Sequence, residues 1–159
     1  MAIVYIGLGT NLGDKQKNMA TAVQLLTERV GSLSALSSYI ETAPWGFESS
    51  NSFLNGVASF DTSVAPLHLL RTTQEIETEM GRTIKGGTVY HDRIIDIDLL
   101  IYDQLIFKNS ILELPHPLLT QREFVLAPLV EIAPTLQYPV TQKTIEQIYT
   151  EFKLQIQDK

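Results

Sequence analysis

Arg93-Ile94-Ile95-Asp96-Ile97-Asp98-Leu99-Leu100-Ile101-Tyr102 is the stretch that decides the fold. It is apolar and rich in β-branched residues, which predicts a buried strand. Side chains alternate along a strand, so Asp96 and Asp98 are expected on one face, about 6.6 Å apart. The opposite face is expected to join a core through Ile95, Ile97, Leu99 and Ile101.

Two carboxylates on one face repel each other and need protons, arginine or a metal ion to neutralise them. Hard oxygen ligands together with substrate phosphates are the usual means by which Mg²⁺ is held. The functional interpretation is therefore a Mg²⁺–phosphate site at Asp96 and Asp98. The alternative is an edge strand whose aspartates face water, and an Asp-x-Asp pair alone does not decide between the two.

The composition is that of an acidic globular protein. The chain has 159 residues and a formal net charge of −6. This length favours one domain spanning residues 1–159, and the charge argues against general nucleic-acid binding. The absence of cysteine excludes disulfides and thiolate zinc sites. No stretch resembles a signal peptide or approaches the roughly 18 apolar residues of a membrane span, so we expect a cytoplasmic protein, and we expect a monomer.

Hydrophobic periodicity divides the chain into strands and helices. Strands are predicted at residues 3–8, 33–41, 53–61 and 93–102, with a short hairpin return at 105–107. Amphipathic helices are predicted at about 15–30, 66–81 and 144–152, and Gly31 is expected to end the first. The order β-α-β-β-α-β predicts an α+β sandwich of ferredoxin-like type, with two helices on one sheet face and extra C-terminal elements.

Two loops carry residues suited to ligand binding. The glycine-rich loop from Gly9 to Asp14 follows the first strand, yet it has neither the Gly-Lys-Ser/Thr of a Walker loop nor the spacing of a dinucleotide fingerprint. A tight turn into the helix is the simpler interpretation. In residues 42–51, Trp45 and Phe47 flank a glycine, and they either stack on a flat ligand or plug the core.

Other side chains fit either a site or a plain structural role. Asn55 shares a strand face with Phe53, and its amide suits both the edge of a heterocycle and an inter-strand hydrogen bond. Gln74 and Glu77 are three residues apart, which places them together on a helix face, and solvent exposure is the simpler expectation for such a pair. Residues 82–92 combine glycines with cationic residues, which predicts a mobile lid beside a phosphate site.

A proline-bounded segment near residue 116 supplies three further candidates. Its prolines predict a rigid turn before a short helix. His116 and Arg122 are both able to face phosphate, and Phe124 either packs in the core or stacks on a ligand. A histidine between prolines is more often only a turn residue, so His116 alone does not indicate a site.

Taken in order, these motifs resemble the 6-hydroxymethyl-7,8-dihydropterin pyrophosphokinase family of folate biosynthesis. The resemblance covers residues 3 to about 139, and its specificity comes from the ordered set. The set comprises Gly9-Thr10-Asn11-Leu12-Gly13-Asp14, Glu41-Thr42-Ala43-Pro44, Phe53-Leu54-Asn55, Gln74-x-x-Glu77 with Gly81-Arg82, Arg93-x-x-Asp96-Ile97-Asp98, Pro115-His116-Pro117 and Arg122-x-Phe124-Val125-Leu126-x-Pro128-Leu129.

The resemblance implies transfer of the β,γ-diphosphate of ATP, the co-substrate, to the pterin hydroxymethyl group, with release of AMP. It implies that Asp96 and Asp98 bind two Mg²⁺ ions bridging the triphosphate, and that these aspartates act in catalysis with Arg82 and Arg93. The family's ATP-side positions match Gln74, Glu77, Arg82, Lys85, Arg93, Leu99, His116 and Arg122. Its pterin-side positions match Thr42, Ala43, Pro44, Trp45, Phe53, Asn55, Asp96 and Phe124.

The lid departs from the family pattern. Where the family usually reads Trp-Gly-Pro-Arg, this chain has Tyr90-His91-Asp92-Arg93, and the loop is one residue longer. Ile84-Lys85 replaces a second lid arginine. Lys85 offers a point charge but not the bidentate fork of a guanidinium. Trp45 also replaces a smaller apolar residue, which adds a ring for stacking.

Two other functions stay open on the sequence alone. A different enzyme on the same scaffold would use Mg-ATP with another heterocyclic alcohol. A non-catalytic ferredoxin-like sensing or assembly module would instead use an exposed sheet edge. Mg²⁺-dependent ATP binding separates the module from the two enzymes, because the module has no need of it.

Overall fold

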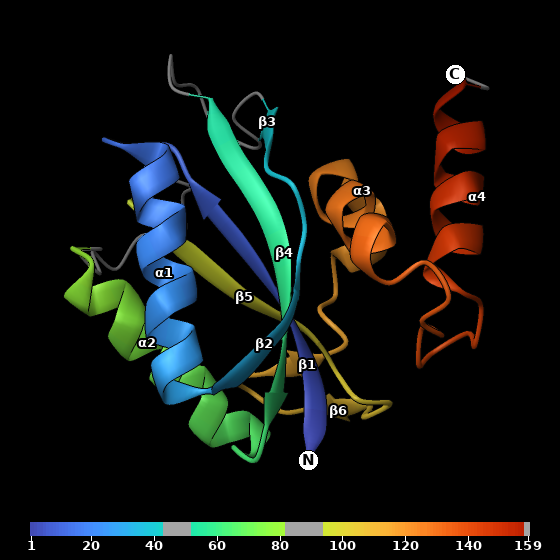
Figure 1. Ribbon diagram of the computed structural model, residues 1–159. Helices are drawn as coiled ribbons and strands as arrows, with labels where there is room; N and C mark the ends of the chain where they lie inside the picture. The colour runs from blue at the N-terminus through green and yellow to red at the C-terminus, as the bar shows by residue number, and fades with distance from the viewer. Residues whose placement is uncertain (43–51, 82–93, 158–159) are drawn as a thin grey trace.

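The computed structural model describes residues 1–42, 52–81 and 94–157. Their main element is a five-stranded antiparallel sheet with helices on both faces, and a second, two-stranded sheet lies beside it (Figure 1). The strands are β1 (Ala2–Thr10), β2 (Gly31–Leu36), β3 (Ile40–Thr42), β4 (Phe53–Thr62) and β5 (Asp96–Tyr102). Their order is β2-β4-β1-β5, and β3 also pairs with β4. The central pair, β1 and β4, is therefore flanked by shorter strands.

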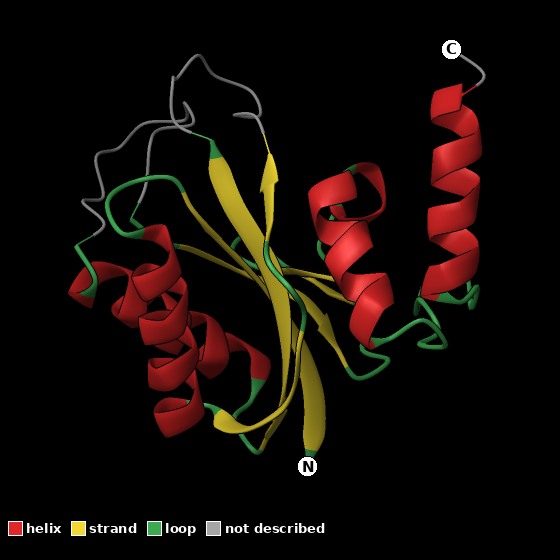
Figure 2. Cartoon of the chain, turned by 45° about the horizontal axis from the view of Figure 1, so that its top comes forward, coloured by secondary structure: helices red, strands yellow, loops and turns green. Residues whose placement is uncertain are grey.

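The helices divide between the two faces of the sheet (Figure 2). On one face lie α1 (Lys15–Arg29) and α2 (Pro66–Glu79), as expected for a ferredoxin-like βαββαβ order. On the other face, a 3₁₀ turn η1 (Leu119–Gln121) leads into α3 (Glu123–Ile132), and α4 (Ile145–Gln157) packs on the outside of α3. The predicted fold class, with extra C-terminal elements, is confirmed.

Two buried clusters fill the space on either side of the sheet. The first lies under α1 and α2 and includes Ile6 and Phe60. The second lies under α3 and α4 and includes Val57 and Leu126. Odd-numbered residues of β4 and of β1 therefore face α3, while even-numbered residues face α1 and α2.

The first helix begins and ends close to the predicted positions, but its end has a different cause. Asp14 caps α1 by accepting the backbone N–H of Lys17 at 3.1 Å. Gly31 is not a left-handed helix cap; it is the first residue of β2. A Cβ atom there would lie 1.8 Å from the carbonyl oxygen of Asp61. Gly31 is thus required by the close approach of β2 to β4.

The predicted strand at 33–41 is wrong as one continuous element. The main-chain ladder breaks at Ser37, whose hydroxyl accepts the N–H of Val57 at 2.9 Å in place of a carbonyl. The chain then resumes pairing with β4 as the short strand β3. A side-chain hydrogen bond to the partner strand β4 therefore marks the point where the predicted strand divides in two.

A β-bulge changes the faces of β5 near its end. Tyr5 pairs with Ile101 but Ile6 pairs with Leu99, so Leu100 is an extra residue in β5. Ile101 consequently lies with Leu100 in the cluster under α3. The prediction that Ile101 shares the face of Leu99 is wrong, because strict alternation does not survive the bulge.

The hairpin return predicted at 105–107 is only partly right. A short strand β6 (Phe107–Lys108) forms, but it pairs with β7 (Glu113–Leu114) rather than with β5. Asp103 adopts a left-handed φ of 48° and accepts the N–H of Ile3 at 2.7 Å. The chain leaves the main sheet at this turn.

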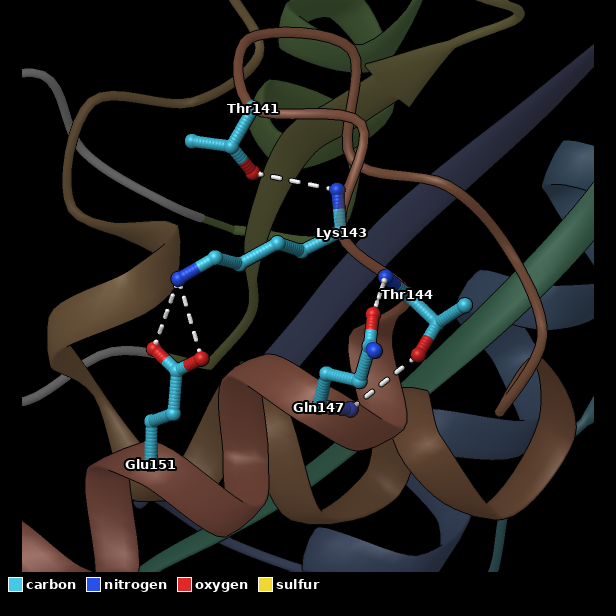
Figure 3. Close-up of polar contacts among 5 residues, drawn as sticks. All are labelled: Thr141, Lys143, Thr144, Gln147 and Glu151. Atoms are coloured by element: carbon cyan, nitrogen blue, oxygen red, sulfur yellow. Dashed lines mark hydrogen bonds and ion pairs between the residues drawn. The ribbon is translucent and has the colours of Figure 1, made fainter.

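The C-terminal helix is longer than predicted, since it continues to Gln157. Figure 3 shows how it begins. Thr144 accepts the N–H of Gln147 at 3.1 Å, and the Gln147 side chain accepts the N–H of Thr144 at 2.8 Å. This reciprocal capping box satisfies two backbone donors at the start of α4. Within the described residues, no helix is long and apolar enough to cross a membrane.

Candidate active site

The two aspartates of β5 lie where the sequence predicts, on one face of the sheet. Asp96 pairs with Gly9 and Asp98 pairs with Gly7, and both aspartates are half-buried. Ile97, between them, is buried in the cluster under α1 and α2. The carboxylates therefore belong to the opposite face, which α3 covers in part.

A hydrogen-bonded amide lies on the same face, two strands away. Asn55 is only 6% exposed, and its Nδ2 donates to Oγ1 of Thr42 at 2.8 Å. Thr42 itself pairs with Phe53 across β3 and β4. The predicted inter-strand hydrogen bond therefore exists, and it fixes the direction in which the Asn55 amide points.

A cavity of about 410 Å³ opens between β3 and the start of α3. It has a size suited to a small-molecule ligand. Three of the residues predicted from the family pattern line it, namely Thr42, Arg122 and Phe124. The rest of its lining is Ile40, Glu41, Gln121, Glu123 and Ala127.

Arg122 is buried beside this cavity, with 8% of its surface exposed. Its guanidinium carbon lies 5.5 Å from the centroid of the Phe124 ring, which is a cation–π distance. Arg122 is the N-cap residue of α3 and Phe124 lies in its first turn, so the guanidinium and the ring are both carried by the start of one helix. The site therefore contains a fixed cation next to an aromatic ring.

His116 is attached to β5 at the bulge. The backbone N–H of His116 donates to the backbone carbonyl of Leu100 at 2.8 Å. The ring Nδ1 of His116 accepts the backbone N–H of Leu118 at 3.1 Å. Burial lowers the pKa of His116, and the charge of Arg122 lowers it further, against the opposite effects of Asp96 and Glu113. The ring is accordingly neutral near pH 7, with its proton on Nε2.

Glu77 is buried, whereas solvent exposure was the simpler expectation for it. Only 6% of its surface is exposed, and its Oε2 accepts the backbone N–H of Ile97 at 2.8 Å. Gln74, three residues earlier, is exposed as predicted. Glu77 thus braces β5 from the α2 side, at the residue that separates Asp96 from Asp98.

The remaining predicted site residues divide into two groups. The Leu99 side chain is 4% exposed and packs in the cluster under α1 and α2, so only its main chain is suited to contact a ligand. The other group lies outside the described residues and consists of Ala43, Pro44, Trp45, Arg82, Lys85 and Arg93.

One positioning contact was missed in the sequence. Glu131 of α3 accepts from the N–H of Ser38 at 3.0 Å and from its hydroxyl at 2.7 Å. This contact ties α3 to the segment between β2 and β3, and so fixes the two walls of the cavity relative to each other. The two residues are 93 positions apart, and no local pattern links them.

Comparison with known proteins identifies relatives along most of the chain. A family model described as 7,8-dihydro-6-hydroxymethylpterin-pyrophosphokinase matches residues 5–134. A Porphyromonas gingivalis 2-amino-4-hydroxy-6-hydroxymethyldihydropteridine pyrophosphokinase is 49% identical over 140 residues, covering 86% of this chain and 94% of that protein. The Aquifex aeolicus protein of the same name is 36% identical over 151 residues, covering 95% of this chain and 92% of that protein.

Solved structures support the fold independently. A Plasmodium falciparum HPPK-DHPS crystal structure with pteroate superposes with a TM-score of 0.80 at 16% identity. The match covers 99% of this chain and 45% of that one, so this chain spans under half of the Plasmodium protein. At such low identity, the likeness concerns the fold alone.

The contact of Glu77 with β5 predicts a difference between two substitutions. Glu77→Ala leaves the buried N–H of Ile97 without this acceptor, which should lower the free energy of unfolding by about 1–3 kcal/mol. Glu77→Gln keeps an oxygen at the same position and should lose less. Urea denaturation gives the stabilities, and hydrogen exchange at the Ile97 amide should accelerate only in the alanine variant. An equal loss of unfolding free energy in the two variants would contradict a stabilising role for the hydrogen bond from Ile97 to Glu77.

The lowered pKa of His116 predicts a pH dependence of stability. The unfolded chain takes up a proton at this residue near the ordinary pKa of about 6.5, whereas the folded chain does so at a lower pH. Stability is therefore present above about pH 6.5 and is lost as the pH falls through the folded-state pKa. The imidazole proton resonance of His116 should titrate below 6.5, and His116→Gln should flatten the acid side of the stability curve. A midpoint at or above 6.5 would contradict the burial argument.

Proposed function

The chain belongs to the 7,8-dihydro-6-hydroxymethylpterin-pyrophosphokinase family, and we propose that the sheet face bearing Asn55, Asp96 and Asp98 is its active site. It is an ATP-dependent diphosphotransferase that transfers pyrophosphate from ATP to hydroxymethyldihydropterin in folate synthesis. The observation that carries the site proposal is the row across β4, β1 and β5, in which a fixed amide and a carboxylate flank one glycine. One end of this row suits a heterocycle and the other suits a metal-bound phosphate.

Enzymes of this family use ATP, generally with Mg²⁺, and we assign the metal to Asp96 and Asp98. Their carboxylate oxygens are the hard ligands that Mg²⁺ prefers, and their shared face lets both reach the same phosphates. We propose that these two aspartates together would hold two Mg²⁺ ions. Bound metal would neutralise the triphosphate and lower the barrier to transfer. The role of the two aspartates is to hold that charge beside the acceptor.

On the acceptor side, we assign the pterin ring to Thr42, Phe53, Asn55 and Phe124, together with Ala43, Pro44 and Trp45 from the family pattern. Asn55 is the strongest of these, because its amide is buried and held by Thr42. A buried amide selects ligands sharply, since a ring with the wrong donors would leave it unsatisfied. Aromatic side chains add stacking surface.

On the nucleotide side, we assign Arg122 and His116 to the phosphates. Arg122 is permanently charged, and its burial strengthens its attraction to a phosphate oxygen. In a neutral His116 ring with Nδ1 accepting from Leu118, the Nε2–H is the group left to donate. We retain Gln74, the Leu99 main chain, Arg82, Lys85 and Arg93 from the family pattern.

Catalysis of this kind depends on positioning and charge neutralisation more than on covalent chemistry. The rigid parts of the site serve that purpose. We further propose that the protein works as a single-domain monomer in the cytoplasm. Its 159 residues are within the size of one ordinary domain, and its lack of cysteine fits a reducing compartment.

A product assay tests the proposed function. The protein is mixed with ATP, Mg²⁺ and 6-hydroxymethyl-7,8-dihydropterin, and the nucleotides are resolved. AMP that forms only when the pterin is present, together with a diphosphorylated pterin, is the expected result. ADP in place of AMP would mean simple phosphoryl transfer and would overturn the assignment of the reaction.

The metal assignment predicts the effect of Asp98→Ala. Loss of one of two metal-holding carboxylates should lower turnover by on the order of 10³-fold, while the thermal unfolding temperature changes little. Asp61→Asn, which alters an acidic residue on another strand of the same sheet, is the matched control and should retain activity. Turnover of Asp98→Ala near that of the control would contradict the assignment.

A further inference from the structure

Gly9 lies at the centre of the proposed site and has no assigned role. It pairs with Asn55 on one side and with Asp96 on the other. Adjacent strands are about 4.8 Å apart, so the row from Asn55 to Asp96 spans roughly 10 Å. Side chains in such a row share one face, and at its centre there is no side chain.

The backbone conformation does not explain the glycine. Among the described residues, the glycines with left-handed φ are Gly13 and Gly81. Gly9 has an ordinary strand geometry that any residue adopts without strain. The reason for glycine at this position is therefore space rather than flexibility.

The space above Gly9 belongs to the acceptor side of the site. A Cβ atom at Gly9 would lie 3.1 Å from Oδ1 of Asn55 and 3.7 Å from Cδ1 of Phe53. The first distance is tighter than ordinary contact, so Asn55 would have to move. Its Nδ2 donates to Thr42 at 2.8 Å, and a shift of the amide would disturb that hydrogen bond as well.

A second glycine on the same face of β1 provides a contrast. A Cβ atom at Gly7 would lie 3.5 Å from the side chain of Leu100, which is ordinary van der Waals contact. Gly7 is partly exposed, and the nearest side chain, that of Leu100, leaves room for a methyl group. An added methyl group is thus tolerated at Gly7, whereas at Gly9 it displaces the side-chain amide of Asn55.

We propose that Gly9 is a specificity-determining residue for the pterin acceptor. Its missing side chain lets the Asn55 amide keep the orientation in which Thr42 holds it, on the sheet face that also carries Asp96. The hydroxymethyl group can then reach the phosphates while the ring edge stays paired with the amide. The inference rests on the proposed function, because it assumes that the pterin occupies this face.

The test compares Gly9→Ala with the matched control Gly7→Ala. Dissociation constants for 6-hydroxymethyl-7,8-dihydropterin and for Mg-ATP are measured by calorimetry on the wild-type protein and both variants. Gly9→Ala should weaken pterin binding by about tenfold or more, which corresponds to about 1.4 kcal/mol, with Mg-ATP binding changed less than about twofold. Gly7→Ala should leave both constants unchanged. Equal pterin affinity in the two variants would overturn the proposal.

A double variant shows whether the effect passes through Asn55. Once Asn55→Ala has removed the contacted oxygen, adding Gly9→Ala should cost little further pterin affinity. Full additivity would overturn the proposal. If Gly9→Ala alone does not fold, the double variant should restore folding, and failure to do so would assign Gly9 a purely structural role. A wild-type protein that binds no pterin would instead refute the proposed function.

Discussion

The register of β1 against its two neighbours is the constraint on which the site depends. β1 pairs with β4 on one side and with β5 on the other, so these two strand pairings together align Asn55, Gly9 and Asp96. A slip of one residue in either pairing would turn one of these side chains to the opposite face. The buried clusters on both faces oppose such a slip. Groups proposed for two different substrates are thereby held in one row without contacting each other.

Contacts from outside the sheet complete this arrangement. Glu77 reaches from α2 to the backbone of Ile97, which steadies β5 between its two aspartates. Glu131 performs a similar task from α3 by holding Ser38 ahead of β3. At the bulge, the carbonyl of Leu100 accepts the N–H of His116. Each of these contacts fixes a segment of the site to an element that is itself anchored in a core, which is how a preorganised site is obtained.

Sequence reasoning succeeded where periodicity alone decides the outcome. Alternation correctly put Asp96 and Asp98 on one face, and the amphipathic pattern correctly identified both helices of the ferredoxin-like unit. It failed where a contact with the partner strand interrupts the alternation. The bulge at Leu100 moved Ile101 to the other cluster, and the hydroxyl of Ser37 ended a strand early. Neither a leucine nor a serine at these positions predicts the interruption from the sequence, because the bulge and the hydrogen bond both depend on the partner strand.

The burial of Glu77 illustrates a further limit. A glutamate on an amphipathic helix normally faces water, and its burial here depends on an N–H of a strand twenty residues away. Only the tertiary structure supplies that donor. The family pattern had marked Glu77 as functional but suggested the nucleotide as its partner. The position was therefore recognisable in the sequence, whereas the contact that accounts for it was not.

Charge balance explains how an acidic protein is suited to a polyanionic substrate. The net charge of −6 and the two aspartates both oppose a triphosphate. Arg122 is a buried cation at the site, but burial and Arg122 itself lower the pKa of His116, so that ring contributes a neutral donor. On the proposed assignment, the balance comes from divalent metal at Asp96 and Asp98 and from the basic residues of segment 82–93. On this assignment, the aspartates would repel the nucleotide in the absence of metal and would hold it through bound metal. Nucleotide binding would then be conditional on the metal ion, and substrate capture would be coupled to the charge neutralisation that transfer requires.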